Sequence, residues 1–278
     1  MGGTFAADAL AARTAVVTGV ARGIGQAIAI ELAAVGAHVV GIDRPGESTD
    51  ATAQAIRSAG GVFTPVEADL ADTDRVPALA DRLRAEHGPL HVLVNNAGIA
   101  SIAHAVDVTP AEWRRIMAVN ADAVFLLSAR VGAHMIADGI AGRIVVITSK
   151  NAVAAEAGLA PYNASKAAAW MIVQSLASEF GPHGITVNAV APGMIDTPIG
   201  ESLDVDLAGL TEAWLQRIPS SIGYGSPADV ASAVVYLASD AARYVNGAQL
   251  LVDGGAMADQ LPRQRFMGPA AGIPPRPE

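Results

Sequence analysis

The sequence predicts an α/β fold, in which a parallel sheet carries helices on both of its faces. Short runs rich in β-branched residues alternate with longer alanine-rich segments of helical periodicity along most of the chain. Such strict alternation favours parallel strands joined by right-handed helical crossovers. The 278 residues suit one large domain or two small ones, and we expect a single domain over 1–278 with its core at 14–255.

The alternation assigns the elements in order. The expected strands are 14–18, 39–42, 62–66, 90–94, 144–148, 185–190 and 249–252. The expected helices are 23–36, 48–59, 72–87, 109–137, 160–180 and 227–238. Asp72 could cap the third helix, and Ser226 followed by Pro227 is a typical helix start.

The composition restricts the classes of function. A net charge of −9 argues against nucleic-acid binding, and the absence of Cys excludes disulfides, thiolate metal sites and cysteine nucleophiles. The first residues show no basic region followed by an apolar core, and no apolar run approaches the length of a membrane span. We therefore expect a cytoplasmic protein with no nucleic-acid or membrane partner.

No metal site is predicted. The aspartates between 69 and 74 lack the glycine and the terminal glutamate of a calcium loop. The Gly-Pro pair between His87 and His91 breaks any helix that would place both rings on one face.

A glycine-rich turn, Gly19-x-x-x-Gly23-x-Gly25, joins the first predicted strand to the first helix. Gly19 allows a sharp turn, Gly23 lets the backbone approach a pyrophosphate, and Gly25 permits close packing of the helix. The helix N-terminus offers N–H groups to phosphate, with Arg22 and Ile24 on the same turn. Glycines alone are a weak signal, but the flanking strand and helix strengthen the prediction of a dinucleotide site.

Asp43 ends the second predicted strand, 18 residues after Gly25. A carboxylate there can accept hydrogen bonds from both ribose hydroxyls and would repel a 2′-phosphate, which favours NAD over NADP. Arg44 and Arg22 leave NADP open, because either could approach a 2′-phosphate. Taken alone, Asp43 would be read as an ordinary turn residue before Pro45.

Tyr162 and Lys166 lie four residues apart on a predicted helix and so point the same way. A nearby ammonium favours phenolate and lowers the pKa of a phenol. Tyr162 could then take a proton from an alcohol or return one to a carbonyl oxygen. Ser149 ends the fifth predicted strand, 13 residues before Tyr162. Without further motifs, an exposed helical Tyr–Lys pair would be the simpler interpretation.

An ordered set of motifs over residues 14–255 resembles the short-chain dehydrogenase/reductase family. The motifs are Thr18-Gly19-x-x-x-Gly23-x-Gly25, Asn95-Asn96-Ala97-Gly98, Asn120, Ser149, Tyr162-x-x-x-Lys166 and Pro192-Gly193. Any one of them is common, whereas the ordered set is specific. The resemblance implies a doubly wound Rossmann fold with about seven strands, and a homotetramer or homodimer.

The resemblance also implies roles for the site residues. Ser149 would hold the reacting oxygen, Tyr162 would act as acid and base, and Lys166 would tune Tyr162 and bind ribose. Asn120 would bend its helix and hold a water that relays protons. The implied cofactor contacts are Asp69 with Leu70 near the adenine, Asn96, Ala97 and Gly98 at the cofactor wall, and Pro192, Gly193, Ile195 and Thr197 around the nicotinamide.

Two segments depart from the alternation. The stretch 199–225 corresponds, by the resemblance, to a substrate lid, and the Pro- and Gly-rich tail 256–278 is predicted to be irregular. Trp214 could line the substrate pocket, although packing within its own helix is the simpler interpretation.

Polar residues follow Ser149 directly, and they bear on the substrate. Lys150 and Asn151 would suit a hydroxylated substrate such as a sugar, a polyol or a sugar acid. Asn151 and Met194 are therefore expected beside the substrate, together with Ser149.

We expect an NAD-dependent alcohol dehydrogenase or carbonyl reductase that acts on a secondary alcohol and its ketone. One alternative is a 3-oxoacyl-[acyl-carrier-protein] reductase that uses NADPH, which Asp43 and the acidic balance oppose. Another is a non-catalytic cofactor-binding regulator, which would lack some of the four catalytic residues. All four are present: Asn120, Ser149, Tyr162 and Lys166.

Overall fold

A computed structural model describes residues 5–197, 214–215 and 217–258 of the chain. Seven strands form one parallel sheet in the order β3-β2-β1-β4-β5-β6-β7. The strands are β1 Thr14–Thr18, β2 His38–Asp43, β3 Val62–Glu67, β4 Val92–Asn95, β5 Arg143–Ile147, β6 Thr186–Pro192 and β7 Gln249–Val252. The doubly wound sheet expected from the sequence is confirmed.

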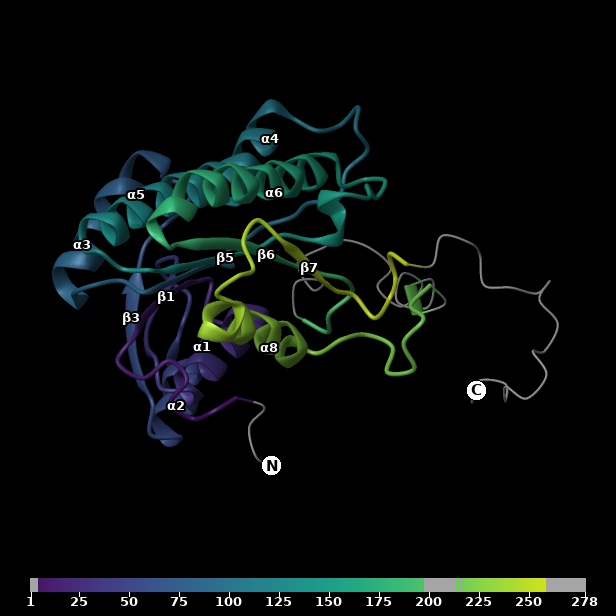
Figure 1. The fold of residues 1–278 in the computed structure, drawn as a ribbon. Helices are drawn as coiled ribbons and strands as arrows, with labels where there is room; N and C mark the ends of the chain where they lie inside the picture. The colour runs from purple at the N-terminus through teal and green to yellow at the C-terminus, as the bar shows by residue number, and fades with distance from the viewer. Residues whose placement is uncertain (1–4, 198–213, 216, 259–278) are drawn as a thin grey trace, which may run out of the picture.

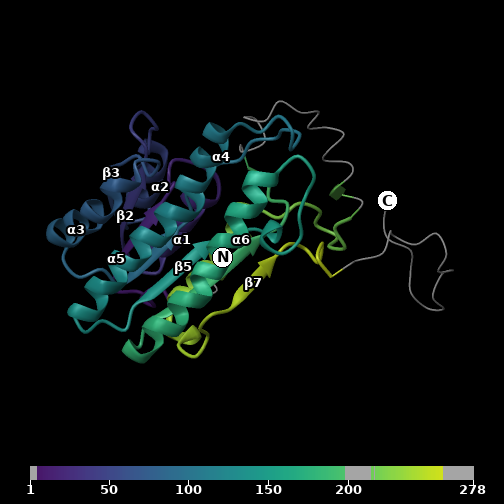
Figure 2. The ribbon, with the colours of Figure 1, turned by 90° about the horizontal axis from the view of Figure 1, so that it is seen from above.

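The helices lie in two layers, one on each face of the sheet (Figure 1). One layer contains α1 Gly23–Ala34, α2 Asp50–Ser58 and α8 Pro227–Ala238. The other contains α3 Val76–His87, α4 Pro110–Met117, α5 Ala123–Ala137 and α6 Ala160–Phe180. Seen from above, α4, α5 and α6 lie over the strands (Figure 2).

The core is divided by the sheet into two apolar clusters. Val17 and Val94 pack toward α1 and α8, whereas Val16 and Leu93 pack toward α3, α5 and α6. Because successive side chains of a strand point to opposite faces, a strand covered on both sides must be apolar throughout. This explains the continuous β-branched runs in the sequence.

The helix expected at 109–137 forms as one continuous segment that contains a π turn. Thr109 caps it by accepting a hydrogen bond from the Glu112 N–H at 3.2 Å, and the π turn covers Ala118–Asp122. At 28 residues this segment is long and apolar enough to cross a bilayer, which corrects the expectation that no apolar run reaches that length. Half of its most apolar window is buried within the protein, as in the core helix of a globular domain.

The expectation that Asp72 caps the third helix is wrong. A short 3-10 turn, Thr73–Arg75, intervenes before α3, and the Asp72 side chain makes no capping hydrogen bond. Its carboxylate instead lies 4.0 Å from the Arg75 guanidinium. The last helix begins at Pro227 as expected, and the Asp229 carboxylate there accepts a hydrogen bond from the Ser226 N–H at 2.7 Å.

Thr18 connects β1 and β4, the two neighbouring strands between which the strand order of the sheet reverses direction. Its buried hydroxyl, at the end of β1, accepts hydrogen bonds from the Asn96 N–H at 3.0 Å and the Ala97 N–H at 2.9 Å, just beyond β4. In open α/β sheets, ligands bind at the carboxyl ends of the strands beside such a reversal point. Thr18 therefore fixes the floor of the crevice that the fold offers to a ligand.

We predict that Thr18→Val lowers the free energy of unfolding by about 1–3 kcal/mol, because two partly buried N–H groups lose their acceptor. Thr18→Ser keeps the hydroxyl and is the matched control. Urea denaturation measures the stability, and fluorescence titration with the dinucleotide measures its affinity. Equal stability of the two variants would contradict the role given to the hydroxyl.

Candidate active site

The glycine-rich turn follows β1 and leads into α1. Gly19 has a φ of +73°, a conformation that residues with a Cβ rarely adopt. A Cβ on Gly25 would lie 1.9 Å from the Gly19 carbonyl oxygen, so only glycine allows α1 to start this close to the turn. Within the described residues, no side chain caps the N-terminus of α1. Its first N–H groups are thus available to an anion, as a bound pyrophosphate requires.

Asp43, at the end of β2, holds the same turn from the other side. Its carboxylate accepts hydrogen bonds from the Ala21 N–H at 2.8 Å and the Arg44 N–H at 2.9 Å. The Arg44 guanidinium is paired with Glu47, and this pairing holds the pKa of the Glu47 carboxyl below its usual value. Arg22 is exposed, on the turn itself. Of the two arginines, Arg22 is therefore the freer to meet a phosphate.

The segment after β4 connects the glycine turn to the catalytic residues. The Asn96 amide donates hydrogen bonds to the carbonyls of Thr18 at 2.9 Å and Gly19 at 3.1 Å. Two residues on, a Cβ at Gly98 would lie 3.2 Å from Lys166 Nζ and 3.4 Å from Asn120 Oδ1. The cofactor wall expected from the sequence thus directly adjoins two of the expected catalytic side chains.

Asn120 occupies the π turn of the long helix and is 1% exposed. Its Oδ1 accepts from the Ile99 N–H at 2.9 Å, and its Nδ2 donates to the Ile99 carbonyl at 2.9 Å and to Ser165 Oγ at 3.0 Å. A π turn stands at this position, and such turns commonly kink helices, but the bend expected at Asn120 stays a prediction. Holding a water for a proton relay stays a prediction for Asn120.

Ser149 and Tyr162 converge from β5 and α6. The Ser149 hydroxyl is buried and accepts a hydrogen bond from the Asn151 N–H at 3.1 Å. Burial raises the pKa of the Tyr162 phenol, a hydrogen bond with the Ser149 side chain opposes that rise, and the Glu156 charge adds to it. The two hydroxyls therefore share one hydrogen-bonded position at the carboxyl end of the sheet.

Lys166 lies one turn further along α6 and is 5% exposed. Its Nζ donates to the Ile147 carbonyl at 2.9 Å and lies 5.6 Å from the centre of the Tyr162 ring. Burial lowers the pKa of Lys166 to about 8. Burial is the largest influence on the pKa of Tyr162 and raises it, and the lowering of this pKa by Lys166 stays a prediction.

The segment after β6 is fastened to neighbouring loops by its backbone. The Gly193 N–H donates to the Val252 carbonyl at 2.9 Å, and the Met194 carbonyl accepts from the Gly225 N–H at 3.0 Å. Ile195 and Thr197 are partly buried at the end of this segment. Most of the expected lid at 199–225 and of the expected tail at 256–278 lies outside the described residues.

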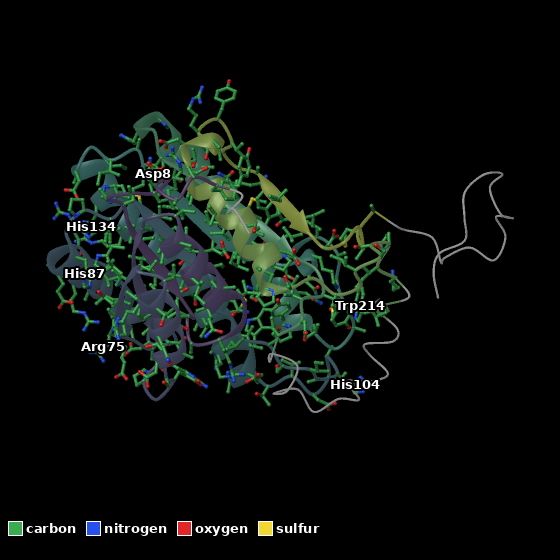
Figure 3. The ribbon with its side chains drawn as sticks, turned by 90° about the horizontal axis from the view of Figure 1, so that it is seen from below. Asp8, Arg75, His87, His104, His134 and Trp214 are labelled. Atoms are coloured by element: carbon green, nitrogen blue, oxygen red, sulfur yellow. The ribbon has the colours of Figure 1, made fainter. Side chains whose placement is uncertain are left out.

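The polar residues after Ser149 are buried rather than open to solvent. Lys150 and Asn151 are each 4% exposed, and both bond to the Glu156 carboxylate, at 2.7 and 3.0 Å. Trp214 covers Lys150, with Nζ 4.0 Å from the ring centre. Whether Trp214 also packs within its own helix involves positions outside the described residues. Figure 3 places Trp214 at the end of the molecule away from His87, which ends α3.

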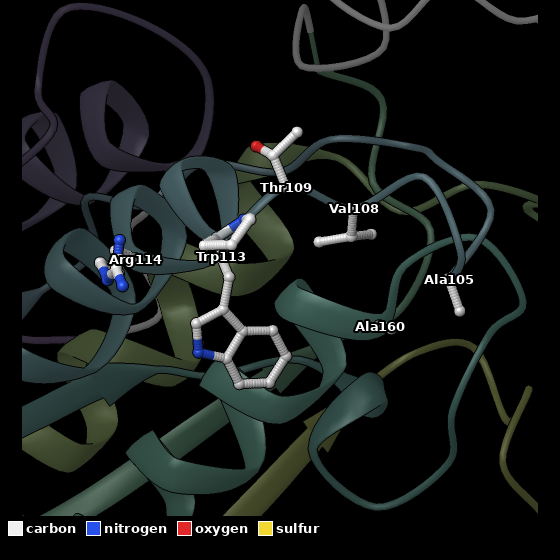
Figure 4. Close-up of a pocket in the computed structure, with 7 residues that line it drawn as sticks. Ala105, Val108, Thr109, Trp113, Arg114 and Ala160 are labelled. Carbon is white, nitrogen blue, oxygen red and sulfur yellow. The ribbon is translucent and has the colours of Figure 1, made fainter.

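Two pockets flank these residues without containing Tyr162. One, of about 380 Å³, lies between the start of α4 and the start of α6, with Trp113 across from Ala160 (Figure 4). The other, of about 340 Å³, is lined by Met194, Gly225 and the loop after β7. Met194 is therefore the expected substrate residue that does line a pocket.

Sequence patterns missed several supporting residues. Thr18, Ser165 and Asn163 each hold a site residue or its neighbour through a single hydrogen bond or pair of bonds. Their partners lie on other elements, and no local spacing signals such contacts. Thr18 lies within the glycine-turn motif and Ser165 within Tyr162-x-x-x-Lys166. Their place in these motifs is the sequence signal that could have identified them. Among the described residues, no group of three or more His, Cys, Asp or Glu side chains could hold a metal ion.

Comparison with known proteins places this geometry in a family. A sequence model described as enoyl-(acyl carrier protein) reductase matches residues 19–257. The chain is 37% identical to 2-dehydro-3-deoxy-D-gluconate 5-dehydrogenase of Escherichia coli, over 91% of this chain and 99% of that protein. It is 44% identical to cis-4-hydroxycyclohexanecarboxylate dehydrogenase of Sinomonas cyclohexanicum, over 90% and 99%.

Solved structures agree with these relatives. A putative NAD(P)-dependent gluconate 5-dehydrogenase from Beutenbergia cavernae, with bound NADP, superposes with a TM-score of 0.85 at 42% identity. The match covers 92% of this chain and all of that one. With its motifs, fold and near full-length relatives, the chain belongs to the short-chain dehydrogenase/reductase family.

Proposed function

We propose that this enzyme transfers a hydride reversibly between NAD(H) and a secondary alcohol or ketone of a sugar acid, a polyol or a related hydroxylated compound. The observation that carries the proposal is the meeting of Ser149, Tyr162 and Lys166 beside Gly98, where the glycine turn and the catalytic helix adjoin. The dehydrogenases named above supply the substrate class, since their names refer to sugar-acid and cyclic alcohol substrates.

The residues of this chain fit a dinucleotide. The free N–H groups at the start of α1 suit the pyrophosphate, and the glycines leave room for its approach. Lys166 donates one of its three N–H groups to the Ile147 carbonyl, so two donors remain for ribose hydroxyls. When bound, the nicotinamide ring supplies the hydride chemistry, and the protein supplies orientation and proton transfer.

Proton transfer falls to Tyr162. In oxidation its oxygen takes the proton of the alcohol, and in reduction it returns a proton to the carbonyl oxygen. Ser149 donates a hydrogen bond to the same substrate oxygen and stabilises the negative charge that develops there. Because burial raises the pKa of the phenol, alcohol oxidation should quicken as the pH rises.

NAD is the proposed cofactor, although related structures contain NADP. Asp43 places a carboxylate beside the turn, where its charge opposes a 2′-phosphate. The Arg44 guanidinium is already paired with the Glu47 carboxylate. Arg22 is the group that would admit the phosphate. The enzyme is therefore NAD(P)-dependent by family, and its preference is set by the balance between Asp43 and Arg22.

We propose that the protein assembles as a homotetramer, with a homodimer as the alternative. Apolar side chains are exposed on two separate faces, with Phe125 on α5 and Met171 on α6, and with Leu250 and Leu251 on the edge strand β7. Exposed apolar groups gathered on defined faces commonly mark contacts between subunits. The cytoplasmic location stays a prediction.

Tyr162→Phe is predicted to lower the turnover of alcohol oxidation by about 10²–10⁴-fold, because the proton loses its acceptor. The affinity for the dinucleotide should stay within about twofold, since the ring remains in place. Steady-state rates and fluorescence titration measure the two quantities. Near-normal turnover would contradict the role of Tyr162.

Asp43→Asn should shift the ratio of kcat/KM for NADP over NAD upward by at least about tenfold, which corresponds to about 1.4 kcal/mol. The amide keeps the size of the side chain and removes the charge that opposes a 2′-phosphate. Arg22→Ala is the matched control and should lower kcat/KM for NADP alone. A wild-type enzyme that prefers NADPH would overturn the assignment of NAD.

The substrate class is tested with a panel of sugar acids, polyols, cyclic alcohols and oxoacyl thioesters, followed by the absorbance of the reduced cofactor. We expect the highest kcat/KM among the first three groups. Turnover confined to oxoacyl thioesters with NADPH would instead identify a 3-oxoacyl reductase.

A further inference from the structure

A polar cluster, formed by the buried Lys150 and Asn151 and the partly buried Glu156 and Asn163, adjoins the proposed catalytic hydroxyls. Three of its members lie between Ser149 and Tyr162 in the connection from β5 to α6, and Asn163 follows Tyr162 at the start of α6. The Lys150 side chain is 5% exposed and the Glu156 side chain 25% exposed, with Nζ and Oε1 2.7 Å apart. An ion pair this sheltered adds little stability, because apolar residues of similar volume commonly serve as well.

Asn151 has no hydrogen-bonding capacity left for a substrate. Its Nδ2 donates to Glu156 Oε2 at 3.0 Å and to Asn163 Oδ1 at 2.8 Å. Its Oδ1 accepts from Lys150 Nζ at 3.1 Å and lies 3.4 Å from Ser149 Oγ. A side-chain amide offers two donors and two lone pairs, so all four are engaged within the protein.

Lys150 is held just as fully. Its three donors face Glu156 Oε1, Asn151 Oδ1 and the ring of Trp214, with Nζ 4.0 Å from the ring centre. The ammonium therefore has a fixed position. It cannot turn toward a substrate without breaking an ion pair that is largely shielded from water.

The cluster ends on Ser149. The backbone N–H of Asn151 donates to Ser149 Oγ at 3.1 Å, which occupies one lone pair of the hydroxyl. Asn151 Oδ1 offers a second, long contact at 3.4 Å, a weak acceptor for the hydroxyl hydrogen. A substrate oxygen at normal hydrogen-bonding distance is a better acceptor than this long contact, so the hydroxyl can donate its hydrogen to the substrate.

The cluster also bears on the charge around Tyr162. Glu156, from the loop before α6, is the negative charge that raises the pKa of this phenol. Lys166 faces the ring from α6, and the π turn contributes the uncharged Asn120. Lys150 is bonded to Glu156 and so opposes its field at the phenol.

We propose that Lys150, Asn151 and Glu156 act as positioning residues, which orient the Ser149 hydroxyl toward the reacting oxygen and balance the Glu156 charge near Tyr162 with the Lys150 ammonium. Asn151 thus acts through Ser149, in place of the substrate contact expected from the sequence. The inference rests on the proposed dehydrogenase function.

The charge part is tested by three variants, Lys150→Met, Glu156→Gln and the double variant, in pH profiles of kcat/KM for alcohol oxidation. Lys150→Met leaves the Glu156 charge unopposed, so the rising limb should move about one pH unit upward. Glu156→Gln leaves the ammonium unopposed, so the limb should move downward by a similar amount. The double variant should return close to the wild-type profile.

If Lys150 and Glu156 have a purely structural role, kcat/KM should fall in the variants while the rising limb of the pH profile stays at the wild-type pH. If the rising limbs of the two single variants do not move in opposite directions along the pH axis, the proposed charge balance between Lys150 and Glu156 is overturned. Thermal unfolding and dinucleotide titration check that each variant is folded. If Lys150→Met does not fold, Glu156→Gln and the double variant still give the comparison.

The orienting part is tested by a double-mutant cycle of Asn151→Ala and Ser149→Ala. We expect Asn151→Ala to lower kcat about tenfold in the wild-type background and to have little further effect once Ser149 is removed. The same fold-loss in both backgrounds would overturn the action through Ser149. A wild-type enzyme without dehydrogenase activity would instead refute the proposed function, so the two failures are distinguishable.

Discussion

The Thr18 hydroxyl holds together the ends of β1 and β4, between which the strand order of the sheet reverses. Every parallel strand delivers its carboxyl end to this same edge, so loops distant in sequence are brought together there. The glycine turn, the Asn96–Gly98 segment and the proposed catalytic hydroxyl of Ser149 all depend on this edge. The site is therefore a consequence of the sheet topology and of one buried hydrogen-bond acceptor.

Asn120, Lys166 and Lys150 are buried in the site, and each is held by backbone groups or by side chains of the protein. Asn120 fastens the Ile99 backbone, Lys166 bonds to Ile147, and Lys150 is enclosed by Glu156 and Trp214. Buried polar groups without partners are costly, and fully bonded networks are rigid. In the proposed mechanism, this rigidity lets the chain present two hydroxyls to one substrate oxygen without reorganising during the reaction.

The sequence predicted those features that depend on local period and on residue type. Helix positions and the shared face of Tyr162 and Lys166 follow from the repeat of about 3.6 residues. Strand positions follow from short β-branched runs, and the glycine turn follows from its residue types. The net rise of the Tyr162 pKa could not be predicted from the sequence, because the burial that causes most of it is a property of the folded molecule. The side chains of Lys150 and Asn151 turn inward for the same kind of reason, since Glu156 and Trp214 reach them only in the fold.

The most direct measurement is a crystal structure of the protein with the oxidised dinucleotide and a turned-over alcohol or its ketone. The account predicts the pyrophosphate against the N–H groups of Gly23–Gly25, and the substrate oxygen within hydrogen-bonding distance of Ser149 and Tyr162. The substrate carbon should then lie about 3–3.5 Å from C4 of the nicotinamide. A dinucleotide bound away from the glycine turn, or a nicotinamide turned away from Tyr162, would contradict it.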